Sequence, residues 1–363
     1  MENKYSLGRD KFRMDGHKLM YHVERVSSWL RGNNIYPIYV EVGLYGGCNH
    51  RCLFCAFDYL NYEPQVLKER CFRDFVSLAS KKGVKSILFS GEGEPLLNPK
   101  AVELTSFARK NSIDVALSTN AVFLDKEKSD KILKNLSWIR VSLNAGSARN
   151  YSFIHGAKAS DFKKVLENLD TAVKIRNKNN FSCTIGVQFL LIPENLEDIP
   201  YLAKSLKRIG VDYLSIKPFS SHPLSKKKGL PAGFRYSKLL SLIEKTGGYS
   251  GKNFRVIFRL DSMLKLEEEK PYNKCLGLPF IAHIDAKGDV YPCNNFVGRE
   301  EFCFGNICGS SFAKIWEGNR RKRIMRKIEN SWDIRGCRRA CRLDSINRYL
   351  WEFKNPGPHI NFI

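Results

Sequence analysis

The sequence predicts an α/β fold built on a parallel sheet, and two observations lead to this prediction. Six apolar runs of strand length alternate with amphipathic segments along residues 38–217, which is typical of βα units with right-handed crossovers. The 363 residues, of which 43% are hydrophobic and 27% charged, are enough for about two domains with an extensive core. Six units are too few for a complete eight-unit barrel.

Each expected strand is a short apolar run that polar or turn-forming residues end. The first, Ile38–Gly43, is rich in β-branched residues and leads into a glycine- and cysteine-rich loop at 45–55. The second, Ser86–Ser90, ends at Gly91. The six expected strands are 38–43, 86–90, 114–118, 138–142, 182–191 and 211–217.

The segments between these strands are expected to be helices, because their apolar residues recur at helical spacing. A helix-like stretch at 17–31 precedes the first strand, within a polar N-terminal region. The expected helices between the strands are 64–82, 99–111, 125–135, 158–177 and 195–209.

Residues 220–250 interrupt the alternation with prolines, glycines and a lysine run, so we expect a domain boundary there. The C-terminal part holds a hairpin-like stretch at 280–292, six cysteines and a basic helix near 311–329. The apolar tail, 356–363, is expected to pack near the open end of the parallel sheet. The expected division is an N-terminal helical extension 1–35, a βα domain 36–225, a connecting segment 226–270 and a cysteine-rich domain 271–363.

The composition limits the cellular setting. No run approaches eighteen apolar residues and the N-terminus has no signal-peptide pattern, so we expect a cytoplasmic protein without membrane contact. The net charge of +23 fits either a lysine-rich solvated surface or an anionic partner. Eleven cysteines in a reducing compartment indicate metal binding or redox chemistry, because disulfides are disfavoured there.

Three cysteines in the loop after the first strand form the strongest motif. Cys48, Cys52 and Cys55 place three thiolates within one compact loop, which can hold a corner of an iron–sulfur cube and leave one iron open. The alternative is a structural zinc knuckle with His50, which needs closed four-fold ligation.

The Cys-x3-Cys-x2-Cys spacing, with an aromatic residue at Phe54, resembles the radical S-adenosylmethionine (SAM) superfamily. The resemblance covers about residues 38–220 and implies a partial (βα)6 TIM-like barrel. It also implies that Cys48, Cys52 and Cys55 are the catalytic ligands of a [4Fe–4S] cluster whose open iron binds SAM. Reductive cleavage of SAM then gives a 5′-deoxyadenosyl radical that takes hydrogen from a substrate, with electrons from a flavodoxin- or ferredoxin-type partner.

A second element agrees with this resemblance. Gly93, Glu94 and Pro95 match the end of the family's Gly-Gly-Glu-Pro motif, which holds the SAM amino group, whereas Glu92 replaces the first glycine and departs from that contact. Polar residues at other strand ends lie where the family binds SAM methionine and ribose, or are satisfied polar residues. These are Ser118, Asn120, Ser142, Asn144 and Gln188.

The C-terminal cysteines resemble the SPASM/Twitch extensions of radical SAM enzymes, which carry auxiliary [4Fe–4S] clusters. The run of the two-cluster SPASM pattern is absent, so the resemblance implies one auxiliary cluster, with zinc as the alternative. Arginines near these cysteines can offset the negative charge of a cluster. The four expected ligands are Cys275, Cys293, Cys337 and Cys341.

The remaining cysteines are not among the expected ligands of these two clusters. Cys303 and Cys308 are interpreted as buried free thiols, with a second auxiliary cluster as the alternative. Cys71 and Cys183 are expected in the core.

Substrate groups are expected at the C-terminal ends of the strands, where His155, Lys217 and His222 are candidates. The likeness to single-cluster Twitch enzymes favours a small polar substrate, possibly anionic, such as a sugar, nucleotide sugar or aminocyclitol. Its oxidation, epimerisation or elimination would be the reaction. The alternatives are maturation of a ribosomally made peptide, RNA modification, for which no nucleic-acid-binding motif is found, and a non-catalytic zinc-stabilised binding protein.

Overall fold

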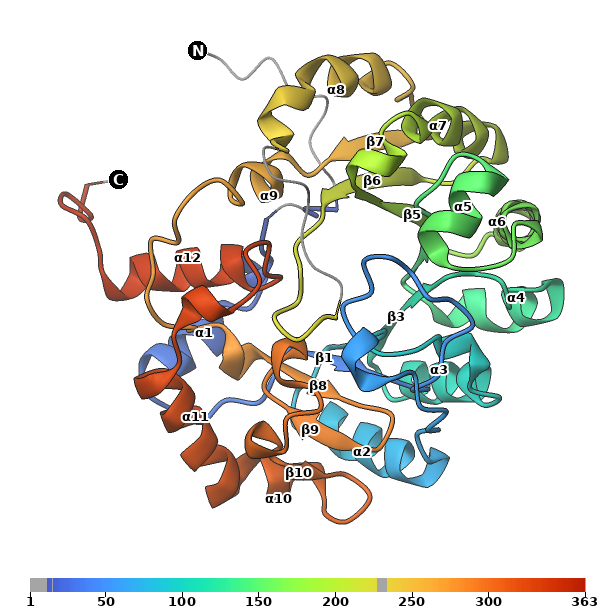
Figure 1. Ribbon diagram of the computed structural model, residues 1–363. Helices are drawn as coiled ribbons and strands as arrows, with labels where there is room; N and C mark the ends of the chain where they lie inside the picture. The colour runs from blue at the N-terminus through green and yellow to red at the C-terminus, as the bar shows by residue number, and fades with distance from the viewer. Residues whose placement is uncertain (1–11, 15, 227–233, 363) are drawn as a thin grey trace.

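The computed structural model describes residues 12–14, 16–226 and 234–362. Its strands form one sheet in the order β10-β9-β8-β1-β2-β3-β4-β5-β6-β7, which curves with helices on its outside (Figure 1). The strands are β1 Tyr39–Val42, β2 Ser86–Phe89, β3 Asp114–Thr119, β4 Trp138–Ser142, β5 Thr184–Leu191, β6 Tyr213–Pro218, β7 Arg255–Phe258, β8 Ile281–Ile284, β9 Asp289–Tyr291 and β10 Gly305–Asn306.

The helices alternate with the parallel strands and then continue through the C-terminal region. Local signals set their ends: the Asp125 carboxylate caps the start of α4, and Gly210 ends α7 in the left-handed conformation. The α-helices are α1 Val23–Leu30, α2 Glu69–Lys81, α3 Ala101–Lys110, α4 Lys126–Ile132, α5 Ala148–His155, α6 Ser160–Lys178, α7 Asp198–Ile209, α8 Leu240–Gly247, α9 Leu260–Leu264, α10 Phe312–Glu317, α11 Asn319–Ser331 and α12 Asp344–Lys354.

The six predicted parallel strands are confirmed as β1 to β6, and two more extend the sheet. β7, in the expected connecting segment, pairs in parallel with β6. β8, from the C-terminal region, pairs in parallel with β1, and β8 and β9 form the expected antiparallel hairpin. The fold is therefore an α/β partial barrel with a mostly parallel sheet, and a cysteine-rich C-terminal region is joined to its first strand.

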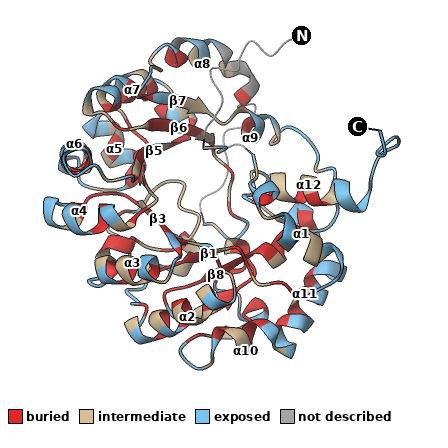
Figure 2. Ribbon diagram, turned by 180° about the vertical axis from the view of Figure 1, so that it is seen from behind, coloured by how far each residue is buried: buried red, intermediate tan, exposed pale blue. Residues whose placement is uncertain are grey.

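The outer face of the sheet carries the hydrophobic core. Val40 and Val42 of β1 and Phe89 of β2 are fully buried, and Phe72 and Phe75 of α2 pack in the same cluster. Figure 2 shows buried residues along the strands and the sheet-facing sides of the helices, with exposed residues outside. Burying one such side chain contributes about 1.5–3 kcal/mol, so this layer fixes the strand positions on which the site depends.

The inner face of the same sheet is unusually polar for a barrel, whose interior is commonly filled by bulky aliphatic residues. In-register neighbours share a face, and the pairing runs without a break from His283 through Glu41, Leu88 and Ala116 to Trp138. The polar residues on this inner face are Glu41, Ser118, Arg140, Ser142, Gln188, Ser215, Lys217 and His283.

The structure corrects two expectations about single residues. Cys308 is exposed and forms a disulfide with Cys71 of α2 across 237 positions, so it is not the buried free thiol expected, whereas Cys71 lies in the core as expected. The pairing arises because α2 packs against the C-terminal region, a contact that sequence distance conceals. The tail also differs, because residues 355–362 are exposed and Phe362 is 82% exposed instead of packed on the barrel.

Some expectations concern residues 1–11, 15, 227–233 and 363, which lie outside the described part of the chain. They include the start of the expected N-terminal extension and the proline and glycines of the expected domain boundary. Among the described helices, none has the length and apolar character needed to cross a membrane.

Candidate active site

The loop that carries Cys48, Cys52 and Cys55 lies between β1 and α2, and α5 holds it in place. Two backbone hydrogen bonds join it to the end of that helix, from Arg51 N to His155 O and from Leu53 N to Ile154 O, both 2.9 Å. Gly156 ends α5 with a φ of +53°, and a Cβ atom there would lie 2.6 Å from the Arg51 carbonyl oxygen. The three cysteines thus sit in a fixed, half-buried loop.

The loop after β2 packs directly against the cysteine loop. Gly93 has a φ of +71°, and a Cβ atom there would lie 1.9 Å from the Tyr45 carbonyl oxygen and 2.5 Å from that of Gly47. Glu94 N donates to the Gly47 carbonyl at 2.9 Å. Glycine is therefore required at 93, because two backbone segments meet there.

The Glu94 carboxylate is buried and anchors two strand ends. It accepts hydrogen bonds from Leu96 N at 3.1 Å, from Asn120 N at 2.8 Å and from the Thr119 hydroxyl. Burial raises the pKa of Glu94, although these hydrogen bonds act in the opposite direction. The Asn120 side chain donates to Asn49 Oδ1 at 2.7 Å, so β3 is tied to the cysteine loop.

His155 is buried against Cys52, with its Nδ1 atom 3.5 Å from Cys52 Sγ. Its other ring nitrogen, Nε2, accepts a hydrogen bond from Asn144 N at 3.1 Å. Burial, with a smaller contribution from His50, lowers the pKa of His155 to about 3, so the ring is neutral near pH 7. Since Nε2 is the acceptor, the proton is on Nδ1 and points at the sulfur.

The other polar strand ends divide into two groups. Asn144 is already engaged, because its Oδ1 accepts from Leu190 N at 2.6 Å and its amide lies 3.4 Å from His155 Nε2. Ser142 and Gln188 are paired in register on the inner face, and Ser118 lies on the same face. The second group is placed to face a molecule bound at the strand ends, whereas Asn144 positions its neighbours.

The four C-terminal cysteines come together from three segments, because Cys337 and Cys341 share one. Three N–H groups are directed at their sulfurs: Trp332 Nε1 at 3.1 Å from Cys337, Leu343 N at 3.4 Å from Cys341, and Asn347 Nδ2 at 3.5 Å from Cys275. Burial and the charges of Cys341 and Cys337 raise the pKa of Cys275 to about 12, and the pKa of Cys293 is raised well above its usual value by burial and the other three cysteines.

A buried charge network joins the C-terminal region to the barrel. Arg342 makes an ion pair with Glu41, at 2.6 Å, and His283 lies 3.3 Å from Glu92 and 3.9 Å from Glu41. Burial alone would lower the pKa of His283, but the two carboxylates outweigh it and raise the pKa to about 9. The glutamate that departs from the expected motif, Glu92, therefore anchors the β8–β9 hairpin.

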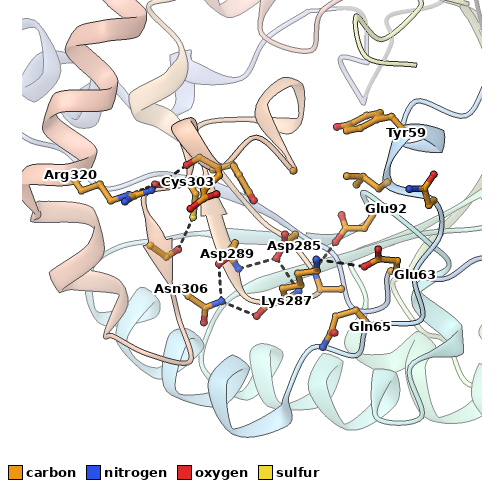
Figure 3. A pocket seen from close by; sticks show the side chains of 18 residues that line it. Tyr59, Glu63, Gln65, Glu92, Asp285, Lys287, Asp289, Cys303, Asn306 and Arg320 are labelled. Carbon is orange, nitrogen blue, oxygen red and sulfur yellow. Dashed lines mark hydrogen bonds and ion pairs between the residues drawn. The ribbon is translucent and has the colours of Figure 1, made fainter. Parts of the chain in front are cut away.

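Two cavities border these elements. The larger, about 620 Å³, lies between the loop after the cysteines and the β8–β9 hairpin (Figure 3). Its acids have partners: Asp285 accepts from the backbone of Lys287 and Asp289, both at 2.9 Å, and Glu63 pairs with Lys287. The second cavity, about 360 Å³, lies on the inner face. We call it the cationic chamber, and its charged lining residues are Lys18, Arg140, Lys217, Arg259, Arg338 and Arg342.

The three predicted substrate residues are placed differently. Lys217 lines the cationic chamber. His222 is 3% exposed, stacks on Tyr59 and accepts from Leu224 N at 3.1 Å, and His155 is 1% exposed. Both histidines are enclosed in protein contacts, which does not fit the expected substrate contact.

Several residues of this region were missed in the sequence. Arg140 is a polar residue in the alternating positions of β4, which is a signal of an inward-facing side chain. Glu41 gives the same signal in β1. Arg259 could not be found in this way, because the strand that precedes it, β7, was not predicted from the sequence.

Together, the open-sided cysteine triplet, the glycine-dependent loop beside it and the second cysteine set define an iron–sulfur enzyme that binds SAM. Comparison with known families agrees: residues 42–206 match the radical SAM superfamily, and residues 275–342 match an iron–sulfur cluster-binding domain, SPASM. The chain belongs to the radical SAM superfamily and has a C-terminal SPASM domain.

Three similar proteins match the chain over most of their length. The chain is 24% identical over 78% of its length to a tungsten-containing aldehyde ferredoxin oxidoreductase cofactor-modifying protein of Pyrococcus furiosus, covering 81% of that protein. It is 23% identical over 74% of its length to the PqqA peptide cyclase of Gluconobacter oxydans, covering 73%. The fold resembles Streptococcus suis SuiB bound to its precursor peptide, with 17% identity, a TM-score of 0.63 and coverage of 84% and 71%.

The side chains present fit both clusters. Each cysteine set offers thiolate ligands with N–H groups directed at sulfur, which is the surrounding that iron–sulfur clusters need. The enzyme therefore uses a SAM-binding [4Fe–4S] cluster, and its SPASM domain binds auxiliary iron–sulfur clusters.

Proposed function

We propose that this radical SAM enzyme modifies a peptide or protein substrate by hydrogen-atom abstraction. The observation that carries the proposal is the combination, along one chain, of the SAM-binding half and the SPASM half. Proteins that match the chain over more than 70% of both lengths include a PqqA peptide cyclase and the fold of SuiB, which was solved with its precursor peptide. This support places peptide maturation ahead of the small carbohydrate-like substrate that cysteine spacing favoured.

With a [4Fe–4S] cluster on Cys48, Cys52 and Cys55, one electron and bound SAM supply a 5′-deoxyadenosyl radical that abstracts a hydrogen atom from the substrate. The chain's own residues hold and shield this reaction. The loop at Gly93 fixes the cysteine loop against β2, and the Glu94 carboxylate keeps β3 in register with it. The inner face of the sheet encloses the reacting groups and limits water access.

Two partners complete the proposal. A flavodoxin- or ferredoxin-type protein would donate the electron, and a reducing cytoplasmic compartment would suit such a donor. Cys341 lines the cationic chamber and influences the pKa of Cys293, which supports an auxiliary cluster beside that chamber. If the peptide is oxidised, an auxiliary cluster at this position would accept the second electron.

The test begins with anaerobic reconstitution of the full chain and an iron and sulfide count. Dithionite and SAM are then added with a mixture of synthetic peptides, and 5′-deoxyadenosine and peptide mass are measured. We expect 5′-deoxyadenosine in all reactions and a change in mass of specific peptides. A Cys52→Ala variant is the matched control and should give neither product.

Two outcomes would oppose the proposal in different ways. If no peptide changes mass while phosphorylated sugars or other small polar molecules are converted, the substrate class is wrong. If the chain binds zinc and forms no 5′-deoxyadenosine, SAM cleavage itself is excluded.

A further inference from the structure

Cationic side chains dominate the described lining of the cationic chamber. Its lining contains six cationic side chains, defined above, and no acidic side chain among the described residues that line it. One of these cations, Arg342, is neutralised by Glu41, which lies behind it. The others come from separate elements: Arg140 from β4, Lys217 from β6 and Arg259 from the end of β7.

Two of these cations have no acidic partner within the described chain, although the Arg140 guanidinium lies 5.1 Å from the centroid of the Trp138 ring. Lys217 forms no ion pair with an acidic group in the described chain, and the Arg140 Nε atom is buried without a hydrogen-bond partner. Burial, and then the charges of Arg140 and Arg338, hold the pKa of Lys217 well below its usual value. Bringing like charges together inside a protein is costly unless an anion joins them.

The auxiliary cysteines account for only part of this charge. Arg338 lies close enough to Cys341 to lower its pKa, so this cation offsets the thiolates of the auxiliary site. Arg140 instead has Tyr213, Arg342 and Tyr39 as its principal charged or titratable neighbours. The auxiliary cysteines therefore do not compensate the charges of Arg140 and Lys217.

We propose that the cationic chamber binds the carboxylate of an acidic side chain in the substrate peptide, with Lys217 and Arg140 as its main partners. This inference rests on the proposed function and names the substrate feature that the site selects. The chamber is lined by Gln188 on the side of the strand ends and by Cys341 on the side of the SPASM domain. An acidic residue held there fixes the neighbouring peptide carbons between the two sites.

The size of the chamber supports a side chain rather than a large ligand. Its volume of about 360 Å³ is near the lower end of the range for ligand sites, about 300–1,000 Å³. A guanidinium group pairs with carboxylate or phosphate through two parallel hydrogen bonds, so an arginine-lined chamber suits such anions, and the small volume favours a carboxylate. The larger cavity of Figure 3 suits an anion less well, because acidic side chains outnumber Lys287 and Arg320 in its lining.

The test measures binding of two capped dipeptides to the reconstituted, SAM-loaded full chain by calorimetry. N-acetyl-Glu-Glu-amide should bind at least about tenfold more tightly than N-acetyl-Gln-Gln-amide, because only the former carries charge. Lys217→Met and Arg140→Met should each weaken the Glu-Glu affinity by about tenfold. Lys204→Met, which removes the same charge from an exposed position on α7, should leave it unchanged.

Two results would overturn the inference. The first is equal affinity of the wild type for both dipeptides. The second is an affinity for the Glu-Glu dipeptide that is the same in the chamber variants and the wild type. Sodium tripolyphosphate, tested in parallel, distinguishes phosphate from carboxylate: selective tripolyphosphate binding that needs Lys217 would assign a phosphate site instead. Retained far-UV circular dichroism and iron content in both chamber variants show that lost binding is not lost folding.

The same samples separate this inference from the proposed function. If 5′-deoxyadenosine forms and peptides are modified without selective Glu-Glu binding, only the chamber assignment fails. If the Glu-Glu dipeptide binds selectively but peptides are not modified, the peptide-modifying function fails while the anion site stands.

Discussion

The two cysteine sites are constructed in opposite ways. Cys48, Cys52 and Cys55 belong to one loop, whose shape is set by backbone contacts with α5 and with the Gly93 loop. Cys275 and Cys341 belong to segments on either side of the β8–β9 hairpin, and Asn347 of α12 donates to Cys275 Sγ at 3.5 Å. The first site is local, whereas the second depends on the whole fold.

This difference has consequences for how each site responds to change. In the local site, the neighbours of sulfur include a single imidazole, His155, and one backbone N–H, that of His50 at 3.4 Å from Cys48. In the SPASM site, donors come from Trp332 and Asn347, which lie on segments of their own. Substitutions near the first site should therefore change the properties of its cluster, whereas substitutions near the second should change whether its ligands come together.

The largest expected effect tests the local site. Cys52→Ala removes one of three cluster ligands, so 5′-deoxyadenosine formation with dithionite and SAM should fall to background. Cys183→Ala is the matched control, because Cys183 is a buried core residue in neither cysteine set. Persistent 5′-deoxyadenosine in Cys52→Ala would remove this cysteine from the site.

The next effect tests the independence of the two sites. Cys337→Ala should lose roughly four irons per chain and keep the [4Fe–4S] signal of the first site, because the ligand sets share no residue. Cys303→Ala should keep the full iron content, since Cys303 has carboxylates and an arginine as its charged neighbours rather than the other cysteines. An unchanged iron count in Cys337→Ala would exclude it as a ligand.

The same contrast explains how much of the fold was predictable. β1 to β6 were each found from their apolar runs, because strand periodicity is a local property. β7 was missed because it is a four-residue strand beyond a break in the pattern. The pairing of β8 with β1 could not be found, since nothing near residue 281 specifies a partner more than 200 positions earlier.

The candidate site follows the same division. The spacing of Cys48, Cys52 and Cys55 is contained in one segment, so it was open to sequence reasoning. The disulfide between Cys71 and Cys308 was not, because only the packing of α2 brings these cysteines together. The role of Glu92 was hidden for the same reason, as its partner His283 arrives from β8.

A smaller effect concerns the charge network between the two sites. The pKa of His283 is raised to about 9 in the folded state, above its ordinary value of 6.5. Its contribution is therefore complete below pH 6.5 and is lost as the pH rises through 9, a change of about 2 to 3 kcal/mol in the free energy of unfolding. Thermal unfolding at pH 6.5 and pH 9 measures it.

His283→Gln should flatten this pH dependence relative to the wild type. His359→Gln, which changes a histidine in the exposed tail, should keep it. If the wild type and His283→Gln lose stability equally between the two pH values, the imidazolium does not join the SPASM hairpin to the barrel.

The smallest effect tests the claim that chemistry controls the local site. His155→Phe keeps a ring that can stack on Tyr151 but removes the Nδ1–H directed at Cys52 Sγ. A hydrogen bond to a cluster sulfur favours the reduced, more negative state, so its loss should make the midpoint potential more negative.

The expected shift is roughly 40 mV, equivalent to about 1 kcal/mol for a one-electron couple, and an EPR-monitored titration measures it. Tyr151→Phe is the matched control, because it removes the hydroxyl that lies 3.3 Å from His50 Nε2 but keeps the ring that stacks on His155. Equal potentials in His155→Phe and the wild type would mean that the imidazole positions the loop without tuning its cluster.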